Sequence, residues 1–255
     1  MSTGELAFTW WGHASVTVEI GGARVALDPL FVDRLVHLKR YTARPGAHAW
    51  DADVVLVSHL HADHLHRGSL KRFAPDVPIV VPRGGEVLLA RHHPERVRGV
   101  VPGDVVESAG VTITVLPATH DGRRGPHARA SGPSLGFRVD AAGRSFWFPG
   151  DTELRADMAD VGHVDLALVP IGGWGPSLDD GHMDPVDGAS AVARVGASFA
   201  VPVHWGTFWP IGLSSLRRAN HELLFVTPGL RFVEAMAGVD ARPLLAEHGV
   251  RVSLS

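Results

Sequence analysis

The chain has 255 residues, 45% of them hydrophobic and 20% charged, and this length and composition suit a globular protein with a sizeable core. Its formal net charge of −3, from 24 basic and 27 acidic residues, gives no basic field of the kind that attracts nucleic acid. The chain contains no cysteine, so disulfides and thiolate metal ligands are excluded. Histidine and carboxylate side chains are the strong metal ligands that remain.

Signals for export or membrane insertion are not expected in this sequence. The first residues lack the basic and apolar regions of a signal peptide, and no apolar run approaches the roughly 18–20 residues needed to span a bilayer. We therefore expect a cytoplasmic protein without a transmembrane segment. No long polar linker divides the chain, so residues 1–255 are predicted to form a single domain. Both a monomer and a homo-oligomer are compatible with the sequence.

Strand and helix patterns alternate along the first half of the chain. The predicted elements are strands over Leu6–Trp10, Ser15–Ile20, Arg24–Leu27 and Val54–Val57, a helix over Arg67–Phe73, a strand over Val77–Val81, a helix over Gly84–His92 and a strand over Val111–Leu116. Residues 31–50 mix basic and apolar side chains, and we expect an irregular excursion there that can serve as a lid.

The same alternation continues through the second half. The predicted elements are a hairpin of Leu135–Val139 with Arg144–Phe148, a strand over Val164–Val169, a helix from Pro185 to Val195, a strand over Phe199–Val203, a helix over Thr227–Ala237 and a strand over Val250–Leu254. Asp184 is expected to cap the helix that Pro185 begins, because its carboxylate can accept from the first free backbone N–H groups. Strands that alternate with helices predict an α/β fold.

Four ionisable side chains follow the strand over Val54–Val57 within six residues, in the sequence His59-Leu-His-Ala-Asp-His64. In extended backbone, side chains two positions apart point the same way, so His59 and His61 can reach one cation. Asp63 and His64 lie beyond the strand end, where the chain can turn toward a neighbouring point. Two pairs of ligands indicate two metal ions rather than one, and the alternative is a solvated loop rich in histidine.

Three further candidate ligands each follow an apolar strand directly: His120, Asp151 and His204. Side chains that leave neighbouring strands at one edge of a sheet converge on a point and are held by a rigid base. Asp151 stands in Pro149-Gly-Asp-Thr152, at a turn that glycine relaxes. The alternatives are a turn-forming aspartate and two packed histidines.

The order of these motifs resembles the metallo-β-lactamase fold along the full length of the chain. The resemblance implies an α/β (α+β) fold with four layers, an αββα sandwich in which two mixed β-sheets are flanked by helices. The implied ligands are His59, His61 and His120 for one ion, Asp63, His64 and His204 for a second ion, and Asp151 as a bridge. Two divalent cations are therefore expected, Zn²⁺ first and Mn²⁺ as the alternative. A hydroxide bridging two such ions is a strong nucleophile at neutral pH.

Finer motifs resemble one branch of that superfamily, the L-ascorbate-6-phosphate lactonase and N-acyl-phosphatidylethanolamine phospholipase D group. They are Trp11-Gly-His-Ala-Ser15, Asp28-Pro29, His182-Met-Asp-Pro185 and His204-Trp-Gly-Thr-Phe208. The resemblance implies that His182 lies near the substrate and polarises one of its oxygens, and that His13 and Asp28 orient metal ligands. The alternatives are a packed turn histidine at position 13 and a neighbour of the helix cap at position 182.

The chain departs from the phospholipase pattern directly after His120, where Asp121 stands in place of a tryptophan, so the substrate is not carried over. Arg123 and Arg124 can bind a phosphate or a carboxylate, and the alternative is a solvated pair of loop charges. The glycine-rich loop that contains Trp174 is expected to form a wall of the substrate site.

The sequence therefore predicts a metal-dependent hydrolase that cleaves an ester, a phosphodiester or a lactone in a small molecule. Asp63 would orient or deprotonate the attacking water. The alternatives are a nucleic-acid phosphodiesterase, a promiscuous β-lactam hydrolase and a non-catalytic protein that binds a ligand through its metals. The net charge of −3 disfavours the first alternative, and the presence of all seven ligand positions disfavours the last.

Overall fold

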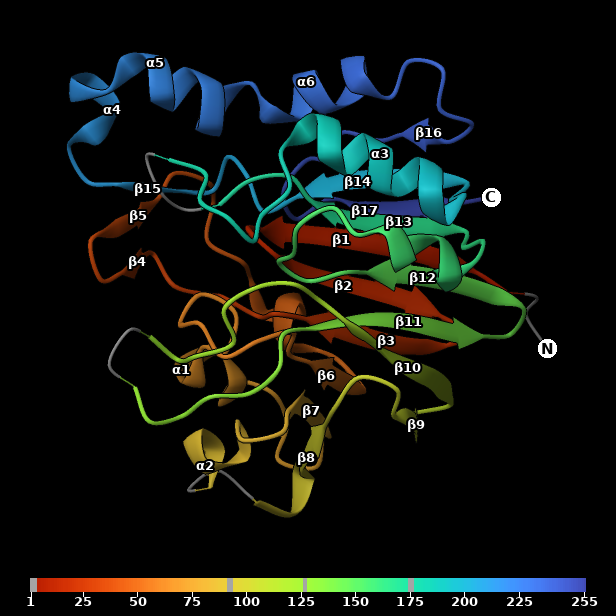
Figure 1. The fold of residues 1–255 in the computed structure, drawn as a ribbon. Helices are drawn as coiled ribbons and strands as arrows, with labels where there is room; N and C mark the ends of the chain where they lie inside the picture. The colour runs from red at the N-terminus through yellow and green to blue at the C-terminus, as the bar shows by residue number, and fades with distance from the viewer. Residues whose placement is uncertain (1–3, 91–93, 126–127, 174–176) are drawn as a thin grey trace.

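Two seven-stranded sheets form the centre of the computed structural model, which describes residues 4–90, 94–125, 128–173 and 177–255 (Figure 1). The strand order in the first sheet is β17 (Arg251–Leu254), β1 (Leu6–Gly12), β2 (Ser15–Ile20), β3 (Ala23–Leu27), β6 (Val54–Leu56), β7 (Ile79–Pro82) and β8 (Val97–Val100). Its first four strands pair antiparallel and the rest pair parallel, so the sheet is mixed.

The second sheet is also mixed. Its strand order is β16 (Arg242–Pro243), β14 (Phe199–Val203), β13 (Leu166–Pro170), β12 (Arg144–Phe148), β11 (Leu135–Ala141), β10 (Val111–Pro117) and β9 (Val105–Ser108). Strands β9 to β12 pair antiparallel, and β12, β13, β14 and β16 pair parallel.

Helices cover the outer face of each sheet, on opposite sides of the molecule in Figure 1. The helical segments are η1 (Ala47–Trp50), α1 (Arg67–Leu70), α2 (Glu86–Leu89), η2 (Pro94–Arg96), η3 (Ala156–Val161), α3 (Pro185–Val195), α4 (Leu213–Leu216), α5 (Arg218–His221), the π-helical turn η4 (Glu222–Val226) and α6 (Pro228–Ala235). α3 and α6 lie over the second sheet, and α1 and α2 lie beside the first.

Three buried apolar clusters define the layers. The central one joins the facing sides of the two sheets, with Phe8 and Phe137 among its members. A second packs α3 and α6 on the second sheet, and a third packs Leu70 of α1 and Leu89 of α2 on the first. The predicted four-layer αββα sandwich is therefore confirmed.

The α3 helix begins where its sequence predicts. The Asp184 carboxylate accepts hydrogen bonds from the backbone N–H groups of Val186 and Asp187 at 2.8 and 2.9 Å, and Pro185 occupies the first turn, where no N–H partner is needed. Gly196 ends the helix with a φ of +73°, a conformation that glycine adopts without strain.

Residues 31–50 are more regular than predicted. They contain β4 (Arg34–Leu35) and β5 (Leu38–Arg40), which join β15 (Phe208–Pro210) in a three-stranded sheet, followed by η1. The expectation of an irregular excursion is wrong because β5 gains its partner from β15, far along the chain. That pairing leaves no trace in the local sequence.

Other differences lie in short elements. The strands β8, β9 and β16 and the turns from α4 to η4 were not predicted, and the helices α1 and α2 are shorter than expected. β8 reads Val97-Arg-Gly-Val100, too short and too interrupted by glycine to show a period of two. No helix among the described residues is long and apolar enough to cross a bilayer.

The candidate ligands leave the ends of central strands. His59 to His64 follow β6, His120 follows β10, Asp151 follows β12 and His204 follows β14. Ligands from both sheets therefore meet at one end of the sandwich.

Candidate metal centre

One group of donor atoms consists of three imidazole nitrogens. His59 Nε2 and His120 Nε2 each lie 3.1 Å from His61 Nδ1. His59 is fully buried, whereas the other two rings are partly open to solvent. The structure therefore brings together the three histidines that were predicted to share one ion.

Hydrogen bonds on the far sides of these rings orient their lone pairs. The Ser58 hydroxyl donates to Asp28 and so accepts from His59 Nδ1 at 3.0 Å, while His120 Nδ1 donates to the Gly181 carbonyl at 3.0 Å. A neutral imidazole has one N–H, so Nε2 of both rings carries a lone pair directed at His61. His61 can donate to only one of them, and the other lone pair needs a cation.

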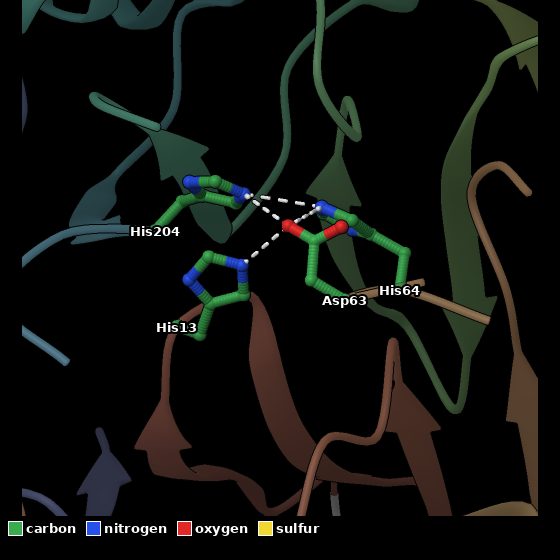
Figure 2. Close-up of side chains that lie close together, drawn as sticks. All are labelled: His13, Asp63, His64 and His204. Carbon is green, nitrogen blue, oxygen red and sulfur yellow. Dashed lines mark hydrogen bonds and ion pairs between the residues drawn. The ribbon is translucent and has the colours of Figure 1, made fainter. Parts of the chain in front are cut away.

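A second group lies beside the first and is drawn in Figure 2. His64 Nε2 lies 3.1 Å from His204 Nε2, and Asp63 Oδ2 lies 3.5 Å from the former and 4.0 Å from the latter. The two rings are stacked, with an interplanar angle of 15°, and both are fully buried. These are the three residues that were predicted to share the second ion.

Asp151 lies between the two groups. Its Oδ2 atom is 3.2 Å from Nε2 of both His64 and His204, and the residue also falls within donor distance of His59 and His120. The other oxygen, Oδ1, is buried and has no hydrogen-bond partner among the described residues. A buried carboxylate oxygen without a partner is costly unless a cation or water satisfies it.

Asp28 joins the two groups from behind. Its Oδ2 atom accepts from His64 Nδ1 at 2.7 Å and from the Ser58 hydroxyl, whose oxygen contacts His59. The backbone N–H of Ser58 donates to the other carboxylate oxygen at 2.7 Å. One fully buried carboxylate thus contacts the far side of two candidate ligands, directly at His64 and through Ser58 at His59.

His13 performs the corresponding task for Asp63. Its Nε2 atom lies 2.9 Å from Asp63 Oδ2, and its ring packs on His204 with a centroid distance of 3.9 Å (Figure 2). Three non-glycine residues of the site have positive φ: His13 (+54°), Asp28 (+38°) and His204 (+64°). Such backbone strain persists where the surrounding structure fixes a functional geometry.

His182 stands at the open edge of the cluster. Its Nδ1 atom bonds the Asp179 carbonyl at 3.1 Å, which turns Nε2 toward Asp151 Oδ2 at 3.5 Å. The side chain keeps 15% of its surface exposed, so it faces both the carboxylate and the solvent.

Three buried carboxylates dominate the electrostatics of the site. Burial acts to lower the pKa of His64, but Asp151, Asp63 and Asp28 outweigh it and raise that pKa well above the usual value. Burial lowers the pKa of His13 to about 3 and that of His120 to about 4. The three carboxylates thus favour positive charge at His64, which a bound cation would supply once that ring releases its proton, while His120 stays neutral.

The two arginines predicted to bind an anion have partners within the protein. The exposed Arg123 forms a bidentate ion pair with Asp121, with a shortest contact of 2.8 Å. Arg124 donates to three backbone carbonyls of the ligand loop, those of Leu60, His61 and Leu65, at 2.7, 3.2 and 2.7 Å. These contacts do not support the predicted anion-binding role. Trp174, also predicted to contact substrate, lies outside the described residues.

Two polar residues of the site were not singled out from the sequence. Ser58 links Asp28 to His59, and its position directly before the first histidine is the signal that points to it. Thr207 accepts from the backbone N–H of His13 at 2.6 Å, and the His13 carbonyl in turn accepts from His204 N–H at 2.9 Å. This bonding joins two motifs that are distant in sequence.

The donor set fits divalent metal ions. Two imidazole nitrogens bound tetrahedrally to zinc at ~2.0–2.1 Å would lie ~3.3 Å apart, close to the 3.1 Å spacings within each group. The unpartnered Asp151 oxygen and the convergent lone pairs also call for cations. Nitrogen and carboxylate donors without thiolate suit Zn²⁺ or Mn²⁺.

Fold and donor set together are those of the metallo-β-lactamase fold, and the family comparison agrees. The family model described as the beta-lactamase superfamily domain matches residues 23–205. The chain belongs to this family, in the metallo-β-lactamase fold superfamily, and is a metal-dependent hydrolase.

Two curated relatives extend the comparison. The chain is 32% identical over 241 residues to a UPF0173 metal-dependent hydrolase of Nitratidesulfovibrio vulgaris, covering 90% of this chain and 92% of the relative. It is 31% identical over 230 residues to N-acyl-phosphatidylethanolamine-hydrolyzing phospholipase D 1 of Caenorhabditis elegans. That match covers 80% of this chain but 64% of the nematode protein.

Solved structures share the fold. Igni18, a metallo hydrolase from Ignicoccus hospitalis, superposes with a TM-score of 0.71 at 20% identity, covering 98% of this chain and 99% of that one. An isothiocyanate hydrolase from Delia radicum gut bacteria gives the same TM-score at 15% identity, with the same coverage. At these identities the likeness concerns the fold alone.

Proposed function

We propose that the chain is a dinuclear hydrolase that cleaves a small-molecule ester, phosphodiester or lactone. The observation that carries the proposal is the position of Asp151 between two groups of donor atoms. A single ion would use one group and leave the lone pairs of the other without a partner. The relatives named as metal-dependent hydrolases and as a phospholipase D support hydrolysis of an ester-type bond.

Each group would hold one ion. The proposed ligands are His59, His61 and His120 for the first ion, Asp63, His64 and His204 for the second, and Asp151 for both. Two divalent cations, when bound, would lower the pKa of water and stabilise the negative charge that develops on the substrate oxygen.

The residues around the ligands would position the reactants. His13 fixes the Asp63 carboxylate through its 2.9 Å contact, so Asp63 can orient the attacking water and accept its proton. His182 presents Nε2 at the open edge of the site, where it can hydrogen bond to the substrate oxygen. His59, His64 and Asp28 are fully buried, so bulk water is excluded from the rear of the site.

The test is a substrate panel with metal-loaded protein. p-Nitrophenyl acetate, γ-butyrolactone, bis-p-nitrophenyl phosphate and nitrocefin represent an ester, a lactone, a phosphodiester and a β-lactam. We expect turnover of at least one of the first three, abolished by a chelator and by His59→Ala. Protein with no turnover of any of them, or turnover unchanged in His59→Ala, would contradict the proposal.

A further inference from the structure

We propose that the metal centre acts on substrates with an uncharged apolar substituent, which is bound in a cavity formed by the β4–β5 hairpin. The inference rests on the proposed function and narrows it: the substrate class becomes neutral esters or lactones with a short hydrocarbon group. For an ester, water adds to the acyl carbon, the bond to the leaving oxygen breaks, and a carboxylic acid and an alcohol are released.

The cavity opens directly beside the candidate ligands. Its volume is about 340 Å³, and its walls are Leu35, Val36, His37 and Leu38 on the hairpin and His61, Ala62, Asp63 and Gly125 opposite. Because one ligand from each proposed ion belongs to the wall, a group in this cavity is adjacent to the bond that is cleaved. A volume near the lower end of the range for ligand pockets suits a short substituent.

The wall is apolar apart from the ligands and His37. In the hairpin Leu35 pairs with Leu38, and Arg34 pairs with Lys39. Since successive side chains of a strand point to opposite faces, the leucines face the cavity and the two cations point to the other face. No guanidinium or ammonium group of the described residues lines the cavity.

The nearby arginines do not supply the missing charge. Arg123 is bound to Asp121, and Arg124 is bound to the carbonyls behind the ligand loop. A charged substituent in the cavity would therefore lose its hydration without gaining an ion pair to an arginine or lysine side chain, which is unfavourable. An apolar group loses nothing comparable and gains by leaving water.

The conformation of Val36 at the hairpin tip is a second, independent observation that supports an apolar binding site. It has a φ of +54° and leaves 88% of its surface exposed. Positive φ is strained for a β-branched residue, and a two-residue hairpin turn favours glycine at such a position. Stability of the free protein explains neither the strain nor the exposed apolar side chain. Contact with a bound apolar group at the cavity entrance explains both.

The residue that follows β15 contacts the backbone of the hairpin turn. The backbone N–H of Ile211, directly after β15, donates to the His37 carbonyl at 3.0 Å, and the Ile211 side chain is 52% exposed. Ile211 is therefore held next to the hairpin turn, but it is not among the residues that line the cavity.

The test compares the kcat/KM of metal-loaded protein for p-nitrophenyl hexanoate and p-nitrophenyl acetate. Each buried methylene contributes about fourfold, so half burial of the four additional methylenes gives about 15-fold preference for hexanoate and full burial about 200-fold. We expect a ratio within this range. Equal values for the two esters would overturn the inference and leave the proposed function standing.

Variants of the hairpin test whether it is the source of the preference for hexanoate. Val36→Gly retains the turn, because glycine accepts the positive φ, and should lower the hexanoate-to-acetate ratio about fourfold or more. Leu35→Asn should lower it further. Leu216→Ser is the matched control, because Leu216 is 79% exposed on α4 and outside the cavity. A ratio unchanged in Val36→Gly and Leu35→Asn would overturn the assignment to the hairpin.

A second measurement does not depend on turnover. Methyl resonances of Leu35, Val36 and Leu38 in metal-free protein should shift when hexanamide, an uncharged amide, is added, while those of Leu216 stay unchanged. If neither ester is hydrolysed, the proposed ester hydrolysis is wrong. The chemical-shift changes then show independently whether the cavity binds an apolar group. Absence of shifts at the hairpin would overturn the binding site itself.

Discussion

Asp28 Oδ2 lies 2.7 Å from His64 Nδ1, although the two residues are 36 positions apart in the sequence. Asp28 ends β3 with a φ of +38°, and His64 belongs to the loop after β6, the parallel neighbour of β3. A carboxylate in this position fixes the tautomer of the ring and makes its other nitrogen a better ligand. In the proposed two-ion centre, the contact would make the affinity of the second ion depend on a residue that does not bind it.

Asp28→Asn tests this dependence. The amide retains the shape and one acceptor oxygen, but it removes the negative charge and replaces the other oxygen by an N–H donor. We expect the affinity of the second ion to fall about 10- to 100-fold, with the fold retained. Competition with a chromophoric chelator measures it, and Asp140→Asn, a surface carboxylate paired with Arg138, is the control. Equal affinity in the two variants would remove Asp28 from the site.

Arg124 and its neighbour Arg123 offer a matched pair. Arg124→Ala removes the donor to the carbonyls of Leu60 and Leu65, so we expect about 1–3 kcal/mol lower stability and weaker metal binding. Arg123→Ala removes only an exposed ion pair, which contributes little to stability because solvent screens it. Urea unfolding and metal titration distinguish them. Similar results for both variants would show that Arg124 does not hold the ligand loop.

The positions of the candidate ligands could be predicted because each follows an apolar strand. His120, Asp151 and His204 stand at the ends of strands whose patterns are clear, and the sheet edge then brings them together. The roles of Arg123 and Arg124 could not be predicted in the same way. Their charge suggests anion binding, whereas their contacts depend on where the loop from 121 to 132 folds back.

The cavity and the three-stranded sheet depend on contacts between residues that are far apart in the sequence. β5 pairs with β15 through Arg40 and Phe208, and this pairing shapes the hairpin that forms the cavity. The side chain of Arg40 also donates to the carbonyls of Leu30, Val32 and Trp11. A buried arginine that satisfies three backbone carbonyls is indistinguishable in sequence from a surface charge.

Gly150 positions Asp151 by a close approach. It has a φ of +63°, and an added Cβ would lie 2.5 Å from the Leu135 carbonyl oxygen and 2.8 Å from Ser58 Cβ. We expect Gly150→Ala to lower stability by about 2–4 kcal/mol and to weaken metal binding. Gly143→Ala is the control, because Gly143 has a φ of +74° with no atom within 4 Å of the added Cβ. If both variants lower the midpoint of thermal unfolding equally, the close approach of Gly150 to Leu135 and Ser58 is not the cause.

His248 predicts a dependence of stability on pH outside the metal centre. Its ring lies 4.1 Å from the Trp10 ring, and its Nε2 lies 3.4 Å from the Thr207 hydroxyl. Burial, and then the charge of Arg40, lowers its pKa to about 4. As the pH falls from about 6.5 to about 4, the unfolded chain binds a proton that the folded chain does not, so stability decreases.

His248→Gln removes this titration. At pH 5 the wild type should have lost about 1 kcal/mol more than the variant relative to pH 7, since partial exposure screens the charge. Urea unfolding of the metal-free proteins at both pH values measures the difference. An equal loss of stability in the two proteins between pH 7 and pH 5 would show that the pKa of His248 is not lowered in the folded state.

The number of metal ions tests the central claim most directly. Protein reconstituted with Zn²⁺, freed of excess metal and analysed by inductively coupled plasma mass spectrometry should contain two ions per chain, and Asp151→Asn should contain fewer. Wild-type protein that saturates with a single ion would contradict the two-ion centre built around Asp151.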